Sequence, residues 1–260
     1  MASVSDARER RLRNLPLVLT ISAIALAVIM GGALQTPHPY GHPEFVVDVF
    51  APEVVASAFL AAATALLFPW RAIGWRWPSS GPIAGIVPLI VLAVVGLGCW
   101  LAARATLPSG AEAMAGRSLL ILRTTLLVGL NEEWIFRGLL LATLSLRLGL
   151  RRGAVLAALV FGLFHTLNAF AGEALEVALI QAASTLLIGA VFVRAAIATR
   201  SLLWPVLAHA LHDFVVLDLA RFAAAGAHAA PVLVVTLTAW TLGVICLVQL
   251  FRLEGEPPYR

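Results

Sequence analysis

Long apolar runs, separated by short polar segments, follow one another along nearly the whole chain of 260 residues. Each run has about the 20 residues that a helix needs to cross the hydrocarbon core of a bilayer. The pattern predicts eight transmembrane helices, at residues 15–35, 51–69, 82–103, 118–147, 153–171, 174–197, 201–220 and 230–251. Prolines and glycines in the connecting segments, where a helix cannot continue, support these boundaries. We therefore expect an all-α polytopic membrane protein.

The composition agrees with this fold class. Hydrophobic residues make up 61% of the chain and charged residues 12%, whereas about a quarter of a soluble domain is charged. The net charge of +4 does not indicate a nucleic-acid partner, because the arginines lie in short clusters between apolar runs. Cys99 and Cys246 stand inside apolar runs at no metal-ligand spacing, so we interpret them as small buried hydrophobic residues. The first apolar run is longer than the roughly 7–15 residues of a signal peptide and is interpreted as an uncleaved span.

The arginines predict the orientation of the chain. A cytoplasmic N-terminus places 13 of the 18 arginines on the cytoplasmic side, as the positive-inside rule requires. Three others (Arg104, Arg117 and Arg221) then lie outside, and two (Arg123 and Arg137) lie in the fourth span. An even number of spans returns the C-terminus to the cytoplasm. The alanine-rich composition, in which every basic residue is arginine, suggests a prokaryotic inner membrane.

Several polar or aromatic residues are expected at or beyond the membrane surface. The loop that ends at Glu53, and that also holds Glu44 and Asp48, falls outside in this topology. The sequence gives no reason to assign a ligand role to the histidines of the outer loops (His38, His42 and His228). The tryptophans at 70, 75 and 77 fit an interfacial aromatic belt.

A few ionisable residues remain inside the predicted spans. They are Glu132, Glu133 and Arg137 in the fourth span, His165 in the fifth, and His209, His212 and Asp213 in the seventh. At 1.5 Å per residue from the cytoplasmic boundary, four of them, on three different helices, lie about 12–22 Å deep. Charges at this depth require an internal partner, a water-filled cavity or a chemical function.

The spacing of these residues suggests roles. Glu133 and Arg137 are four residues apart, so they share a helix face and can form an ion pair. Glu132 points about 100° away from that face and has no such partner. It could therefore activate a water molecule with the help of His165. His209 and Asp213 also share a face and could stabilise an oxyanion, whereas His212 points elsewhere and is interpreted as structural.

Two other interpretations use the same residues. The histidines and carboxylates could bind Zn²⁺ in a metallohydrolase, although the chain has neither His-Glu-x-x-His nor Gly-x-Ser-x-Gly. A non-enzymatic membrane carrier or scaffold could also retain a polar core. The sequence offers little positive support for a carrier, because no pair of broken spans marks inverted repeats.

Three motifs together resemble those of the CAAX-protease and bacteriocin-processing family, also called the Abi or CPBP family. They are Glu132-Glu133-x-x-Phe136-Arg137-Gly138, Phe161-x-x-x-His165 and His209-x-x-x-Asp213. The chain is similar in particular to the type II prenyl endopeptidases of that family. The resemblance implies a catalytic core at 118–220 (helices 4–7), preceded by helices 1–3 at 1–117 and followed by helix 8 and a cytoplasmic tail at 221–260.

The resemblance implies a glutamate-dependent intramembrane endopeptidase that requires no metal and cleaves a membrane-anchored protein or peptide near its C-terminal region. Glu132 would be the catalytic base, His165 its partner, and Glu133 and Arg137 supporting residues. His209 and the residue four positions later would form the oxyanion site. Prenyl endopeptidases have asparagine at that later position, where this chain has Asp213. An ionised aspartate would repel an oxyanion, so Asp213 is either protonated, or orients His209, or serves a different use.

Overall fold

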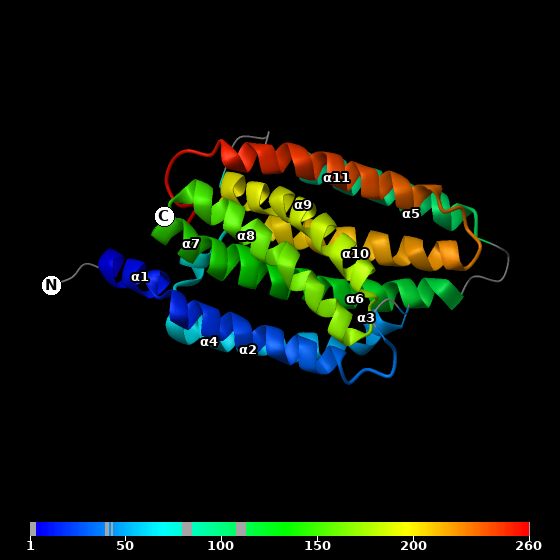
Figure 1. Ribbon diagram of the computed structural model, residues 1–260, viewed down its shortest axis with the longest axis horizontal. Coiled ribbons are helices and arrows are strands. Elements are labelled where there is room, and N and C mark those ends of the chain that lie inside the picture. The colour runs from blue at the N-terminus through cyan, green and yellow to red at the C-terminus, as the bar shows by residue number, and fades with distance from the viewer. Residues whose placement is uncertain (1–3, 40–41, 43, 80–84, 108–112, 260) are drawn as a thin grey trace.

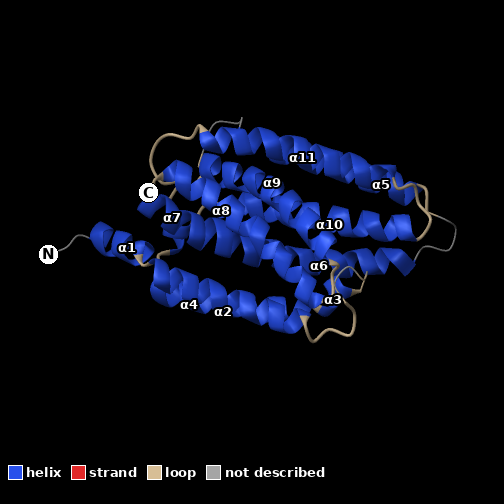
Figure 2. Cartoon of the chain, viewed as in Figure 1, coloured by secondary structure: helices blue, strands red, loops and turns tan. Residues whose placement is uncertain are grey.

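The computed structural model of the protein describes residues 4–39, 42, 44–79, 85–107 and 113–259. All regular structure in these ranges is helical, as Figure 2 shows. The N-terminal helices are α1 (Val4–Arg13), α2 (Leu15–Ala33), α3 (Phe45–Asp48), α4 (Phe50–Leu67), the 3₁₀ turn η1 (Trp70–Ile73) and α5 (Val87–Ala105). The central and C-terminal ones are α6 (Ala113–Glu133), η3 (Trp134–Leu140), α7 (Leu141–Leu148), α8 (Leu150–Phe164), η4 (His165–Ala171), α9 (Leu175–Thr199), α10 (Leu203–Ala224) and α11 (Ala230–Phe251).

The long helices lie side by side along the longest axis of the molecule, and both ends of the chain lie at the same end of the bundle (Figure 1). Seven helical segments of the described residues are long and apolar enough to cross a membrane. Six are single helices (α2, α4, α5, α9, α10 and α11), and the seventh is α8 continued by η4. These findings confirm the predicted class of all-α polytopic membrane protein.

The fourth predicted span is the most polar of the eight. It appears as one helical run in which α6 continues through η3 into α7. η3 is a π-helix, whose wider turns are often found at functional sites. The run carries Arg123, Glu132 and Glu133 in α6 and Arg137 in η3, and α4 and α10 pack against α6. All seven residues of η3 are buried, and so are Glu132 and Glu133, whereas Arg123 in α6 is exposed.

Small residues allow the helices around this run to approach closely. A Cβ atom added to Gly153 at the start of α8 would lie 2.5 Å from the backbone nitrogen of Ser145 in α7. One added to Gly162 would lie 2.8 Å from the carbonyl oxygen of Ala182 in α9. Contacts this short exclude any side chain, which is typical of close helix pairs in membranes. The close packing of α8 on both neighbours positions the end of α8, where His165 follows.

Two of the three tryptophans assigned to an aromatic belt contact another, buried tryptophan. The ring centroids of Trp70 and Trp75 lie 5.3 and 4.9 Å from that of Trp134 in η3. Trp134 is itself buried and donates a hydrogen bond from Nε1 to Thr64 of α4. Trp70 is nevertheless 40% exposed and Trp77 is 85% exposed, as a belt at the membrane surface predicts, whereas Trp75 is partly buried.

Two charged residues expected outside the bilayer lie inside helices. Arg221 is buried in α10, where its Nε donates a hydrogen bond of 2.8 Å to Asp218. Ser118 and Trp100 also donate to Asp218, at 2.7 and 2.8 Å, so this carboxylate neutralises Arg221 within the bundle. Glu53 was expected to end an outer loop, but it lies in the first turn of α4 and is only 2% exposed.

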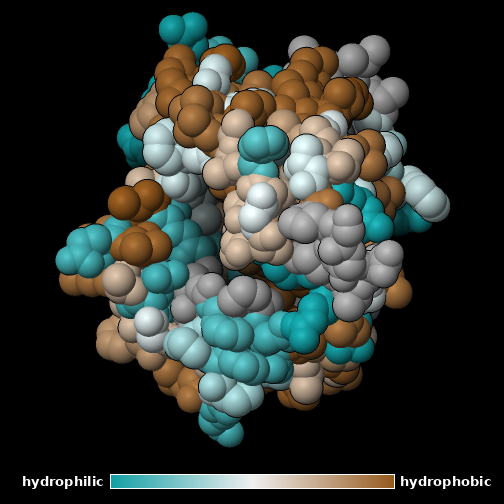
Figure 3. Space-filling model, turned by 90° about the vertical axis from the view of Figure 1, so that its right-hand side faces the viewer, coloured by the Kyte–Doolittle hydropathy of each residue, from teal (hydrophilic) through white to brown (hydrophobic). Residues whose placement is uncertain are grey.

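The end of the bundle opposite the chain termini carries the polar connections between helices. His38 contacts Asp48 at 2.8 Å, and Glu44 pairs with Arg117. Figure 3 views this end directly: hydrophobic residues gather along its upper rim, and hydrophilic residues gather in its lower half. The histidines at 38 and 42 stack on each other here.

Candidate active site

The ionisable residues predicted inside the spans meet between three helical runs. Glu132 and Glu133 end α6, His165 begins η4 directly after α8, and His209 and Asp213 lie one turn apart in α10. The similar depths counted from the sequence thus correspond to one cluster of side chains from distant parts of the chain.

A buried ion pair fixes one side of the cluster. Arg137 Nη1 donates a hydrogen bond of 2.8 Å to Glu133 Oε1, and both side chains are fully buried. Arg137 also donates from Nη2 to the carbonyl oxygen of Gly189, and its guanidinium lies 4.0 Å from the ring centroid of Phe161. The predicted pair between positions i and i+4 is thus confirmed. The carbonyl and the ring support the guanidinium at a depth where an unpaired charge would be costly.

His209 is held by the same carboxylate. Its Nδ1 lies 2.8 Å from Glu133 Oε1, and its ring stacks on Phe192 with a centroid separation of 4.9 Å. A carboxylate accepts hydrogen bonds, so Nδ1 carries a proton. The remaining nitrogen, Nε2, faces the centre of the cluster, 3.7 Å from Glu132 Oε2 and 3.3 Å from Asp213 Oδ2.

Glu132 and Glu133 each have one buried oxygen, Oε2, without a hydrogen-bond partner among the described residues, but Glu133 is held through Oε1 by Arg137 and His209. Among the described residues, Glu132 Oε2 is buried and has no hydrogen-bond partner. It points between His209 and His165, with Nε2 of His165 at 4.0 Å. A buried carboxylate oxygen without a hydrogen bond is rare in folded proteins and marks a place where a water molecule or a ligand completes the structure.

The tautomer of His165 follows from its backbone contact. Its Nδ1 lies 3.0 Å from the carbonyl oxygen of Phe161, one turn earlier in α8. A carbonyl oxygen only accepts hydrogen bonds, so Nδ1 carries the proton and Nε2 of the neutral ring is an acceptor. The acceptor Nε2 therefore faces the acceptor Oε2 of Glu132 across a gap of 4.0 Å.

Asp213 lies at the more open edge of the cluster. Its side chain is 28% exposed, against 4% for His209. Since Oδ2 lies beside His209 Nε2, the aspartate is placed to orient that imidazole. Of the alternatives left open by the sequence, this arrangement favours an aspartate that orients His209.

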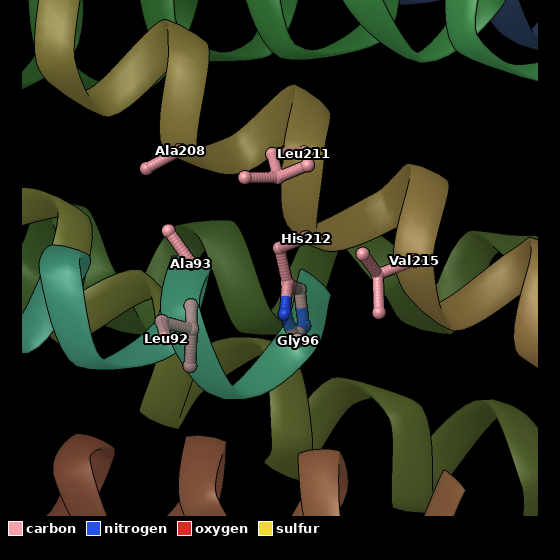
Figure 4. A pocket seen from close by; sticks show the side chains of 7 residues that line it. All are labelled: Leu92, Ala93, Gly96, Ala208, Leu211, His212 and Val215. Atoms are coloured by element: carbon pink, nitrogen blue, oxygen red, sulfur yellow. The ribbon is translucent and has the colours of Figure 1, made fainter. Parts of the chain in front are cut away.

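His212 lies apart from the cluster. Figure 4 shows its ring pointing away from the axis of α10 towards Gly96 of α5, in a pocket that Leu92, Ala93, Ala208, Leu211 and Val215 also line. The divergence of about 100° between neighbouring helical positions accounts for this placement. The position agrees with the structural interpretation of His212.

The zinc alternative would use the same donor atoms. Nδ1 of each histidine in the cluster is engaged, by Glu133 in one case and by the carbonyl of Phe161 in the other, so Nε2 is the available nitrogen of each ring. Glu133 is already shared between Arg137 and His209. Among the described residues, no group of three or more His, Cys, Asp or Glu side chains is arranged to hold a metal ion.

Asn131 and Glu53 lie beside the cluster, and neither was predicted there from the sequence. Asn131 is fully buried and directly precedes Glu132, and its Nδ2 donates to Glu53 Oε2 at 2.7 Å. A polar residue next to the two glutamates was a signal in the sequence, but Glu53 falls near the edge of an apolar run. The hydropathy pattern alone does not distinguish the end of a loop from the first turn of a helix.

The fold and the cluster define a class: an all-α polytopic membrane protein with a buried glutamate–histidine site between its helices. Residues 115–215 match the family described as type II CAAX prenyl endopeptidase, Rce1-like. The match confirms the resemblance indicated by the three motifs and covers every residue of the cluster. Comparisons with curated proteins and with solved structures gave no match.

Proposed function

We propose that the protein is an intramembrane endopeptidase in which Glu132 and His165 activate a water molecule for attack on a peptide bond. The observation that carries the proposal is the buried, unpaired Glu132 Oε2 facing the acceptor Nε2 of His165 at 4.0 Å. Two acceptors repel each other unless a donor lies between them. Two hydrogen bonds of about 2.8 Å to one water join atoms roughly 4.4 Å apart, so a single water fits between Glu132 and His165.

The water in this position is well placed to react. It donates one O–H to the Glu132 carboxylate and the other to His165 Nε2, which leaves its lone pairs free for a substrate carbonyl carbon. Glu132 accepts the proton as the new C–O bond forms, and it can return that proton to the leaving amine. The products are a new carboxyl terminus and a new amino terminus.

His209 is assigned to the oxyanion. The carboxylates of Glu132, Glu133 and Asp213 surround its ring, and an imidazolium among them donates from both nitrogens. Nδ1 donates to Glu133, while Nε2 is directed towards the reacting centre, where a developing oxyanion would accept its hydrogen bond. Asp213 holds Nε2 in that direction, and Arg137 compensates the charge of Glu133.

The proposed substrate is a membrane-anchored protein or peptide cleaved near its C-terminal region. The matched family, by its description, consists of CAAX prenyl endopeptidases, which supports a peptide bond close to a lipid or membrane anchor. The apolar helices support a site within reach of the bilayer. The proposal retains cytoplasmic termini in a prokaryotic inner membrane, because the arginine distribution favours that orientation.

The test compares the termini of membrane proteins from host cells that produce the wild type, Glu132→Gln or His165→Ala at equal inserted amounts. General-base chemistry predicts about a 10²–10⁴-fold loss of processing in both variants, and hence the accumulation of uncut precursors. His212→Ala is the control, since it alters a histidine of the same bundle outside the cluster and should leave processing unchanged. Unchanged termini in both variants would favour the carrier or scaffold interpretation.

A further inference from the structure

A buried carboxylate outside the cluster lies on α4, a helix that packs against α6. Glu53 belongs to the first turn of α4 and is only 2% exposed. None of the steps proposed above uses this residue. Ionisable side chains buried within membrane-spanning helices are costly and generally serve a function, so the contacts of Glu53 require an explanation.

Asn131 contacts Glu53 twice. The Nδ2 group of Asn131 donates to Glu53 Oε2 at 2.7 Å and to the backbone carbonyl of the same residue at 2.8 Å. Ser57, one turn later in α4, has its hydroxyl oxygen 2.8 Å from Asn131 Oδ1 and 2.9 Å from the backbone carbonyl oxygen of Glu53, so these two acceptors share its one proton. The two acceptors beside Nδ2 fix the orientation of the amide. Every polar atom of the Asn131 side chain is therefore engaged by α4.

Asn131 connects this contact to the reacting centre. It is fully buried and precedes Glu132 directly, at the point where α6 passes into the π-helix η3. Neighbouring side chains on a helix diverge by about 100°. A hydrogen bond that holds Asn131 against α4 therefore also sets the direction of Glu132, which points towards His165 and His209. Glu132 has no hydrogen bond of its own at Oε2 among the described residues, so its direction depends on the helix that carries it.

We propose that Glu53 and Asn131 form a positioning pair that fixes the rotation of α6 and holds the Glu132 carboxylate between His165 and His209. This inference rests on the proposed function, since it assigns a role relative to Glu132. Glu53 does not contact the reacting atoms in this account. Its contribution is to the geometry of the base, in which small displacements have large kinetic effects.

The test measures kcat and KM for precursors whose processing depends on Glu132. Glu53→Leu keeps the volume but removes the acceptor, and it should lower kcat about 100-fold, the effect of a displacement of roughly 1 Å. KM should stay within about threefold, because substrate binding is retained. Glu53→Gln keeps an acceptor oxygen for Asn131 Nδ2 and should restore kcat to within about threefold of the wild type.

A matched control and a double variant separate positioning from general packing. Asp218→Asn changes another buried, hydrogen-bonded carboxylate of the bundle, and it should leave kcat per inserted molecule unchanged. Since Glu53 and Asn131 act through one contact, the Glu53→Leu/Asn131→Ala double variant should be no slower than the slower single variant. If Glu53→Leu does not accumulate in the membrane, Asn131→Ala alone decides, with the same loss of kcat expected.

Wild-type kcat in Glu53→Leu, or in Asn131→Ala, would overturn the positioning pair. The same holds if Glu53→Gln is as slow as Glu53→Leu, because the effect would then depend on charge and not on the hydrogen bond. Glu132→Gln is measured in parallel. If Glu132→Gln loses processing while Glu53→Leu keeps it, only the pairing fails. If Glu132→Gln processes normally, the proposed function itself fails.

Discussion

At the scale of single residues, Asp213 is the most informative position of the cluster. Its Oδ2 lies 3.3 Å from His209 Nε2, and the related prenyl endopeptidases have asparagine at this place in the motif. The carbonyl oxygen of an asparagine could accept the same hydrogen bond from the imidazole. Both residue types can therefore orient His209, and only the aspartate adds a negative charge near the proposed oxyanion.

We predict that Asp213→Asn keeps substantial processing, within about tenfold of the wild type, because the oriented imidazole is retained. Asp213→Ala removes the acceptor that orients His209. Since the oxyanion then loses its donor, processing should fall about 10²-fold. The measurement is the rate of precursor processing at equal inserted amounts. Equal rates for the alanine and asparagine variants would contradict the orienting role.

The sequence predicted the residues of the cluster but not the arrangement around it. Counting along the spans placed Glu132, His165 and His209 at similar depth, because a helix has a fixed rise per residue. The role of Glu53 could not be predicted in the same way. Its hydrogen bond to Asn131 joins two helices, and which helices become neighbours is decided by packing.

At the scale of elements, the pair of Glu133 and Arg137 joins the end of α6 to the π-helix η3. The i, i+4 spacing predicted the pair, whereas nothing in the sequence predicted that the helix widens at Trp134–Leu140. Gly189 of α9 packs closely against this pair. A Cβ atom at Gly189 would lie 2.8 Å from the Phe161 side chain and 3.2 Å from Arg137 Nη2, so a larger residue would not fit. The close approach lets the glycine carbonyl reach the guanidinium.

We predict that Arg137→Leu destabilises the protein by roughly 3–5 kcal/mol, because Glu133 is left as a buried charge without its partner. The double variant Glu133→Gln/Arg137→Met should recover much of that stability, since no unpaired charge remains. Thermal unfolding in detergent measures both. A double variant less stable than Arg137→Leu would contradict the account of the pair.

At the scale of the whole molecule, the C-terminal segment closes the end of the bundle that carries both termini (Figure 1). Tyr259 is buried against Leu202, Val206 and Ala142, and a Cβ on Gly74 would lie within 3 Å of its ring. Arg76 donates a hydrogen bond to the carbonyl of Pro258. Burial raises the pKa of the Tyr259 phenol, so the docked ring is neutral at physiological pH.

We predict that Tyr259→Ala releases residues 253–259, whereas Tyr259→Phe leaves them docked because the buried ring is retained. Hydrogen exchange of this segment measures the difference. A raised pKa in the docked state means that docking is fully stable below the ordinary tyrosine pKa of about 10 and weakens as the pH rises above it. Equal protection in the alanine variant would show that the ring does not hold the segment.

The hydrophobic pattern predicted most of the architecture at this scale, since seven of the eight expected spans meet the length and composition of a membrane-crossing helix. The fourth span is the exception because it carries Arg123, Glu132, Glu133 and Arg137. Its charges lower its hydropathy, and the packing of neighbouring helices around it compensates for them. Functional residues obscure a hydrophobic pattern where they are most concentrated.

The most direct measurement is cleavage of an identified precursor by the purified protein in lipid vesicles, comparing the wild type with Glu132→Gln and with Asp218→Asn. The account predicts cleavage by the wild type and by Asp218→Asn, unaffected by removal of divalent metals. It predicts about a 10²–10⁴-fold slower rate for Glu132→Gln. Cleavage by Glu132→Gln at the wild-type rate would contradict the central claim that this buried glutamate activates the attacking water.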